Sequence, residues 1–84
     1  MKFQKRIEET EESIRQKTVA LSLVKEEFEN QLLVLSVLRE TAGVEEKTFF
    51  YIRNLLKDLD LRTKRLEIDI QELENKKEYY IYFS

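Results

Sequence analysis

The chain has 84 residues, with 15 basic residues against 17 acidic ones, and it contains no cysteine and no histidine. Without cysteine it forms neither disulfides nor thiolate metal sites, and without histidine it lacks the commonest general base. The net charge of −2 argues against a nucleic-acid binder held mainly by phosphate contacts. A domain this small has a marginal core, and small scaffolds usually need a disulfide, a metal or a partner subunit, so self-association is the stabilising device that remains.

The sequence also lacks the patterns that accompany catalysis, cofactors and membranes. It has no glycine-rich phosphate loop, and its serines have no histidine base. Four glutamates crowd residues 8–12, but they spread around a helix without the spacing of a cation loop. No apolar run approaches a membrane span, and the start MKFQKRIEETEE lacks the apolar stretch of a signal peptide. We therefore expect a cytoplasmic protein that is not an enzyme and has no cofactor, metal or membrane partner.

The first predicted helix covers about residues 3–42. Apolar residues recur every seven positions and alternate between two seam positions of a heptad, labelled a and d, as in a coiled coil. The a positions are Ile7, Ile14, Leu21, Phe28 and Leu35, and the apolar d positions are Phe3, Val24 and Leu38. Polar residues interrupt this seam at Thr10, Lys17 and Gln31.

A turn is predicted at about residues 42–45, within the segment RETAGVEEKT. Gly43 is the one glycine of the chain, and glycine adopts the left-handed conformation that ends a helix without strain. Glu45 and Glu46 then fall in the first turn of a second helix, where negative charge suits the helix dipole. The alternative is one continuous long coiled-coil helix, because the heptad phase is the same on both sides of Gly43. An interior glycine would cost such a helix only about 1 kcal/mol.

The second predicted helix covers about residues 45–82 and has the cleaner seam. Its a positions include Phe49, Leu56 and Ile70, its d positions are Ile52, Leu59, Leu66, Leu73 and Tyr80, and only Thr63 and Lys77 interrupt it. If the helices fold back on each other, residues whose numbers sum to about 87 lie at one level. This register sets residues 8–12 opposite Lys76 and Lys77, and Lys17 near Asp69, which favours the hairpin.

Apolar residues spread beyond the seam on both sides of the turn. In a hairpin they meet at one end, which we call the apolar head and define by Leu32, Leu33, Val37, Phe50, Tyr51 and Leu55. A two-helix seam cannot bury all of them, and a large exposed apolar patch marks an interaction site. We therefore predict an all-α, antiparallel two-helix coiled-coil hairpin that forms a homodimer, a four-helix bundle, through this head. A groove for a different protein is the alternative use of the same surface.

The chain ends in the aromatic segment KKEYYIYFS, whose aromatic residues are Tyr79, Tyr80, Tyr82 and Phe83. Tyr80 continues the d positions, so one interpretation has the aromatic residues closing the open end of the hairpin. Successive side chains point in different directions around a helix, so the four cannot all face one seam. The alternative is that part of this tail docks on a partner protein, either as a helical anchor or as an added strand.

The expected function is a non-catalytic protein–protein interaction module, a self-associating structural or adaptor hairpin. In architecture such a hairpin resembles prefoldin-like and small secretion-system chaperones, although the turn here is too short for the strands of prefoldin-like chains. That resemblance implies the alternative of a small helper chaperone, or secretion-associated hairpin, that binds and solubilises a partner protein. A remote alternative is an RNA-binding regulator, because the segment KDLDLRTKR holds four basic residues. Asp58 and Asp60 interleave with them and argue against nucleic acid as a partner.

Overall fold

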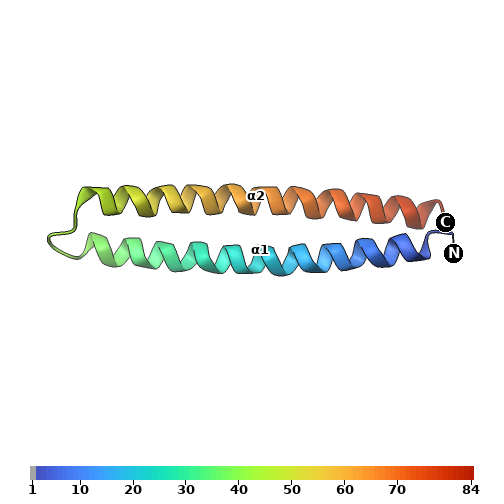
Figure 1. Cartoon of the computed structure of the whole chain (residues 1–84), viewed down its shortest axis with the longest axis horizontal. Helices are drawn as coiled ribbons and strands as arrows, with labels where there is room; N and C mark the ends of the chain where they lie inside the picture. The colour runs from blue at the N-terminus through green and yellow to red at the C-terminus, as the bar shows by residue number, and fades with distance from the viewer. Residues whose placement is uncertain (1) are drawn as a thin grey trace.

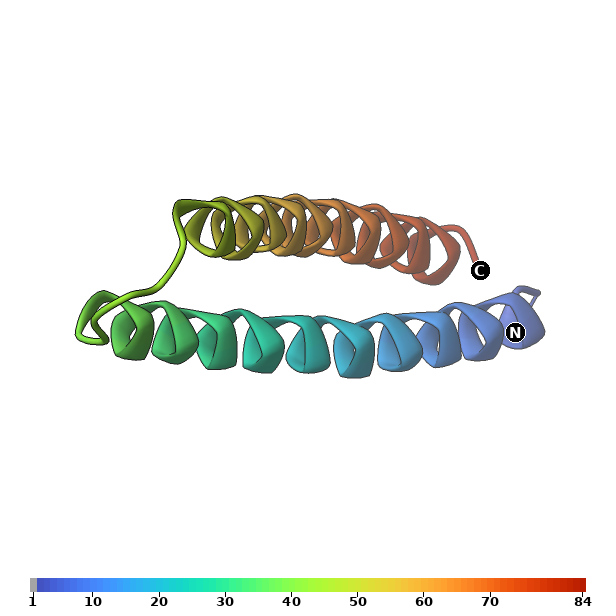
Figure 2. The same ribbon diagram turned by 60° about the vertical axis from the view of Figure 1, so that its left-hand side comes forward.

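A computed structural model describes residues 2–84 as an antiparallel pair of long helices. The first, α1, spans Gln4–Arg39, and the second, α2, spans Glu46–Tyr82. Figure 1 shows them side by side, with both chain ends opposite the turn, and the turned view in Figure 2 agrees. The Cα trace measures 64 × 14 × 12 Å. The predicted all-α helical hairpin is confirmed, and the alternative of one continuous helix is wrong.

Side-chain burial follows the predicted heptad seam. The buried apolar residues are Ile7, Leu35, Ile52, Leu59 and Tyr80, and each of them stands at an a or d position. Thr10 is also buried, and the other a and d residues of both helices are partly buried. This pattern arises because a and d side chains lie on the face that each helix turns toward the other. The core of the molecule is therefore a single seam that runs the length of the helix pair.

The threonines of the seam satisfy their hydroxyl groups within their own helices. The Thr10 hydroxyl donates to the carbonyl oxygen of Arg6 at 2.7 Å, and the Thr63 hydroxyl donates to that of Leu59 at 3.0 Å. Within residues 2–84, no buried side-chain nitrogen or oxygen lacks a hydrogen-bond partner. The polar interruptions of the seam thus leave no unpaired buried group, which would otherwise be strongly destabilising.

Three ion pairs join the helices, and the two shortest of them show the level at which the helices face each other. Lys17 Nζ lies 3.3 Å from Asp69 Oδ2, and Lys77 Nζ lies 3.3 Å from Glu11 Oε1. Both lysines stand at seam positions, and each side chain extends out of the seam so that its amine reaches a carboxylate at the edge. Partly exposed pairs of this kind add little stability but select the orientation of the helices. The predicted antiparallel register is confirmed at both levels.

The first helix ends earlier than predicted, at Arg39 rather than near residue 42. Its last turn tightens, because the amides of Glu40 and Thr41 donate to the carbonyl oxygens three residues before them, those of Val37 and Leu38. The Thr41 hydroxyl also donates to the Val37 carbonyl oxygen, at 2.7 Å. These bonds satisfy carbonyl groups at the helix end and stop the α-helical pattern.

The loop between the helices keeps the predicted backbone at its glycine. Gly43 has a positive φ of 81°, but it lies inside the loop of residues 40–45 rather than directly after the helix. Glu45 has an extended backbone, with φ −68° and ψ 143°, and precedes α2 instead of lying within it. Glu46 opens α2 and places its charge in the first turn, where the helix dipole favours it.

Replacing Gly43 by alanine is expected to destabilise the hairpin by about 1 kcal/mol, because a residue with a Cβ is strained at this φ. No atom lies within 4 Å of the added Cβ, so the loss comes from the backbone alone. Gly43→Asn is the matched control and should lose less, since asparagine tolerates the left-handed conformation. Thermal unfolding followed by circular dichroism measures both. A gain in stability with alanine, as at an interior helical position, would contradict the turn.

Candidate interaction surface

The apolar head lies at the turn end of the hairpin and is largely uncovered. Leu32, Leu33, Val37, Phe50 and Tyr51 are exposed, and Leu55 is partly buried. Val37 and Tyr51 keep 63% and 67% of their surface accessible. The fold therefore brings the six residues to one end of the molecule, and the helix pair leaves five of them exposed.

The seven heptad positions are lettered a to g along the chain, with a at residue numbers that are multiples of seven. Two long faces flank the seam, and ion pairs show which of these positions form each face. Lys25 and Glu67 both stand at e positions, and their charged atoms are 3.8 Å apart, so the e positions of the two helices meet on one side. We call this side, with the neighbouring b positions, the e/b face. Asp69 stands at a g position, and its pair with Lys17 places the g positions on the other side. We call that side, with the neighbouring c positions, the g/c face.

The two faces differ in composition. The large apolar residues of the g/c face within the two helices are Leu23, Val34, Val37, Tyr51, Leu55 and Tyr79, and Phe83 continues the g positions directly after α2. Those of the e/b face are Leu32, Phe50 and Ile81, and its other residues are charged or polar. The g/c face is therefore the more apolar one, and most of its apolar residues lie near the turn.

The apolar head is divided between these faces instead of forming one patch. Val37, Tyr51 and Leu55 belong to the g/c face, whereas Leu32 and Phe50 belong to the e/b face. Leu33 stands at an f position, on the side of α1 that points away from α2. A partner that covers one face thus covers only part of the predicted head.

Two exposed residues extend the g/c face beyond the predicted head. Val34 and Leu23 keep 40% and 61% of their surface accessible. Leu23 lies two heptads before Val37, too far from the turn to be included in a head that is defined by closeness to the turn. The heptad positions of Val34 and Leu23 predict that both belong to this face, because g and c residues share one side of the helix pair.

The aromatic tail has a packed part and an exposed part. Tyr80 is 9% exposed, and its ring centroid lies 5.2 Å from that of Phe3. Tyr79 and Phe83 are exposed and contact each other, with ring centroids 4.7 Å apart. Tyr82 keeps 81% of its surface accessible. Tyr80 therefore closes the open end of the hairpin, while the other three aromatic residues lie outside the seam.

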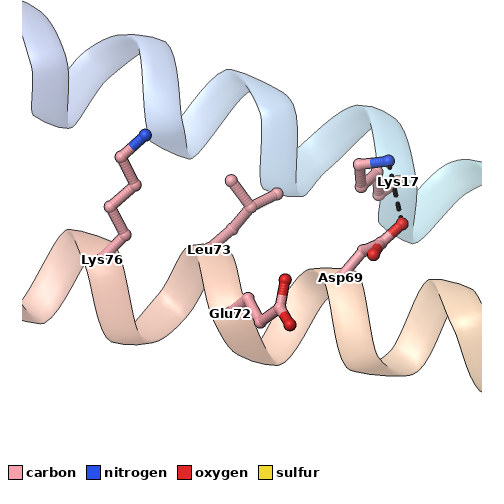
Figure 3. Close-up of a pocket in the computed structure, with 5 residues that line it drawn as sticks. All are labelled: Lys17, Asp69, Glu72, Leu73 and Lys76. Atoms are coloured by element: carbon pink, nitrogen blue, oxygen red, sulfur yellow. Dashed lines mark hydrogen bonds and ion pairs between the residues drawn. The ribbon is translucent and has the colours of Figure 1, made fainter.

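A shallow hollow of about 370 Å³ lies where the helices meet on the g/c face. Figure 3 shows its lining, which consists of Lys17, Asp69, Glu72, Leu73 and Lys76. Lys17 reaches from α1 to its ion pair with Asp69, and Lys76 extends from α2 toward α1. The lining holds two amines and two carboxylates, so their charges cancel. The hollow consequently offers no net charge that would attract a charged ligand.

The acidic segment of residues 8–12 is a solvated helix face. Arg15 donates two hydrogen bonds to Glu12, at 2.6 and 3.0 Å, and these bonds, with its charge, lower the pKa of the Glu12 carboxyl group. Glu11 is engaged by Lys77 of the other helix. Within the described part of the chain, no three acidic side chains gather as a metal site requires. These glutamates therefore serve helix pairing and surface charge.

The basic segment of α2 does not form one stripe. Its basic residues are Lys57 and Lys64 at b positions, Arg62 at a g position and Arg65 at a c position. Asp58 pairs with Arg62, and Asp60 pairs with Lys64, each at 3.0 Å. The cations are thus split between opposite faces and partly neutralised, whereas a phosphate backbone is bound by an unbroken basic surface.

Comparison with protein-family models, with curated proteins and with solved structures found no match for this chain. No helix among residues 2–84 is both long and apolar enough to cross a membrane. The surface of the hairpin itself is therefore the guide to its function.

Proposed function

We propose that this chain is a non-catalytic protein–protein interaction module, which associates with a second copy of itself and serves as a structural or adaptor element. The observation that carries the proposal is an exposed apolar head on a hairpin of only two helices. Such a hairpin has one seam and no second layer. Covering this exposed apolar surface with a second apolar surface lowers the free energy, which favours association.

A second hairpin lying alongside the first would form a four-helix bundle. One face of the molecule measures 64 Å by 14 Å between Cα extremes. That is on the order of 900 Å² per copy, close to the ~800 Å² per partner of a standard stable interface. The bundle would supply a second apolar layer to a chain that has neither disulfides nor thiolate metal sites to stabilise it.

Replacing Val37 and Tyr51 together by glutamate is expected to weaken self-association at least about tenfold, because each copy would bury two unpaired carboxylates. Sedimentation velocity over a concentration series measures the dissociation constant, and circular dichroism checks that the helices persist. The matched control is Val19→Glu with Leu61→Glu, at apolar residues of 60% and 59% exposure outside the head. An unchanged dissociation constant in the head variant, or an equal loss in the control, would contradict the role of the head.

A second candidate is a small helper hairpin that keeps a partner protein soluble, and the exposed part of the tail favours it. Tyr79, Tyr82 and Phe83 offer aromatic surface at the open end, away from the head. Such a helper would be monomeric and poorly stable alone, and it would gain a sharp melting transition with its client. The same sedimentation series separates the two, because a monomer at every concentration excludes a self-associating structural element.

A further inference from the structure

We propose that the second copy binds to the g/c face with both turns at the same end, so that α1 of each copy lies on α2 of the other. This arrangement rests on the proposed self-association, and it specifies the face, the orientation and the charged pairs that select them. Four arguments support it: the composition of the two faces, the register within the hairpin, the placement of charges, and the unfavourable contacts of the opposite orientation.

The composition of the faces selects the g/c side. It carries Val34, Val37, Tyr51 and Leu55 near the turn, whereas the e/b face is mostly charged. The g positions of α1 also include the small residue Ala20, which lets a facing helix approach closely. Covering the e/b face would remove its many charged groups from water, which is unfavourable unless each of them is paired.

The register within the hairpin determines which residues meet across such a dimer. A twofold axis along the bundle keeps every residue at its own level, so α1 faces α2 of the second copy in the same register as it faces its own α2. Val37 then faces Tyr51 of the second copy, and Val34 faces Leu55. The g/c part of the apolar head is thereby covered by the same part of the second copy.

The charged residues of the g/c face complement each other in this orientation. Glu27 faces Arg62 of the second copy. Within one turn, Glu9 lies near Lys76 of the second copy, and Glu27 lies near both Asp58 and Arg65, whose opposite charges offset each other. Because of the twofold symmetry, each of these contacts occurs twice in the dimer. At no level of the g and c positions do two like charges face each other. Complementary charges of this kind select one orientation over another.

The opposite orientation, with the turns at opposite ends, stacks each helix on its own copy and is disfavoured. When the two hairpins overlap along their full length, Arg65 faces Arg65 of the second copy close to the twofold axis. Asp58 then faces Glu72, and these repulsive contacts outnumber the attractive type, Arg62 with Asp69. Val37 faces Glu9 and Leu55 faces Lys76, so two apolar residues of the head meet charged ones, whereas Tyr51 faces Tyr79. Like charges in contact and apolar groups set against carboxylates both oppose association.

Mixing two charge-reversal variants tests the arrangement. In a homodimer of Glu27→Lys the new lysine faces Arg62, and in a homodimer of Arg62→Glu the new glutamate faces Glu27, so both homodimers contain repulsive contacts. In the mixed dimer each chain supplies the charge that the other lacks. We expect native mass spectrometry of an equimolar mixture, with one variant isotope-labelled, to show about ten times more mixed dimer than either homodimer, whereas statistical mixing gives about twice as much. Contacts inside each hairpin are the same in mixed dimers and homodimers, so the preference reports contacts between chains.

The matched control reverses the ion pair of the e/b face, with Lys25→Glu mixed with Glu67→Lys. Statistical mixing is expected there, because these residues stay in solvent. A preference in the control mixture instead would place the interface on the e/b face and overturn the arrangement, while self-association would stand. Statistical mixing in both experiments would overturn it too. A wild-type chain that is monomeric at every concentration would overturn the proposed self-association itself.

Discussion

Leu59→Ala is expected to destabilise the hairpin by about 3 kcal/mol, enough to unfold much of a two-helix domain at room temperature. Leu59 stands at a d position of α2 and is only 1% exposed, and it is the one large side chain that is fully buried among the described residues. Truncation removes its contacts with the facing helix and leaves a cavity, because the backbones of two long helices cannot collapse locally into it. Thermal unfolding at a fixed protein concentration measures the loss.

The matched control for this substitution is Leu61→Ala, two residues further along the same helix. Leu61 is 59% exposed, so the same truncation should change the stability by less than about 0.5 kcal/mol. Leu59→Ala and Leu61→Ala change the same residue type in the same helix, at nearly the same distance from the turn. They differ only in the side of α2 that is altered. Equal losses at both positions would mean that the seam is not where the a and d positions place it.

Tyr80→Ala is expected to destabilise the hairpin by about 2 kcal/mol and to fray its open end. The Tyr80 ring is buried against Phe3, with centroids 5.2 Å apart, at the level where the chain begins and ends. Loss of this contact leaves the first turn of α1 and the last turn of α2 without a packed aromatic residue between them. Hydrogen exchange should therefore quicken at amides near both chain ends, while amides near Leu59 keep their protection.

Tyr82→Ala is the control for the tail, because Tyr82 lies two residues away and is 81% exposed. Its removal should leave both the melting temperature and the exchange pattern unchanged. If Tyr80→Ala behaves in the same way, the tail does not close the hairpin. The interpretation of the whole aromatic segment as a docking site for a partner would then be preferred.

The seam is the part of this fold that the sequence predicts most fully. A period of seven follows directly from the geometry of two helices winding around each other, so the spacing from Ile7 to Leu35 and from Ile52 to Tyr80 already locates the buried residues. The antiparallel register is predictable for a related reason. Lys17 and Lys77 interrupt the seam, and only a hairpin register brings each of them to a carboxylate on the other helix.

The end of α1 and the division of the apolar head are harder to predict. α1 stops at Arg39, where the amides of Glu40 and Thr41 bond to carbonyl oxygens three residues back instead of four, and heptad periodicity does not predict such a local change. Phe50 and Tyr51 are neighbours in the sequence and both lie close to the turn, so the sequence alone places them in one patch. Neighbouring residues on a helix point about 100° apart, so the two lie on opposite faces. A patch predicted from sequence proximity therefore needs the helix register before it describes a surface.

Small-angle X-ray scattering on an absolute intensity scale tests the central claim most directly, because it gives the mass and the longest dimension of the same particle. Two hairpins side by side predict twice the chain mass of 10.2 kDa, with a longest dimension close to the 64 Å length of one hairpin. A mass of 10.2 kDa at every concentration would contradict self-association. Twice that mass with a dimension near double the hairpin length would mean an end-to-end pair, and would contradict the four-helix bundle.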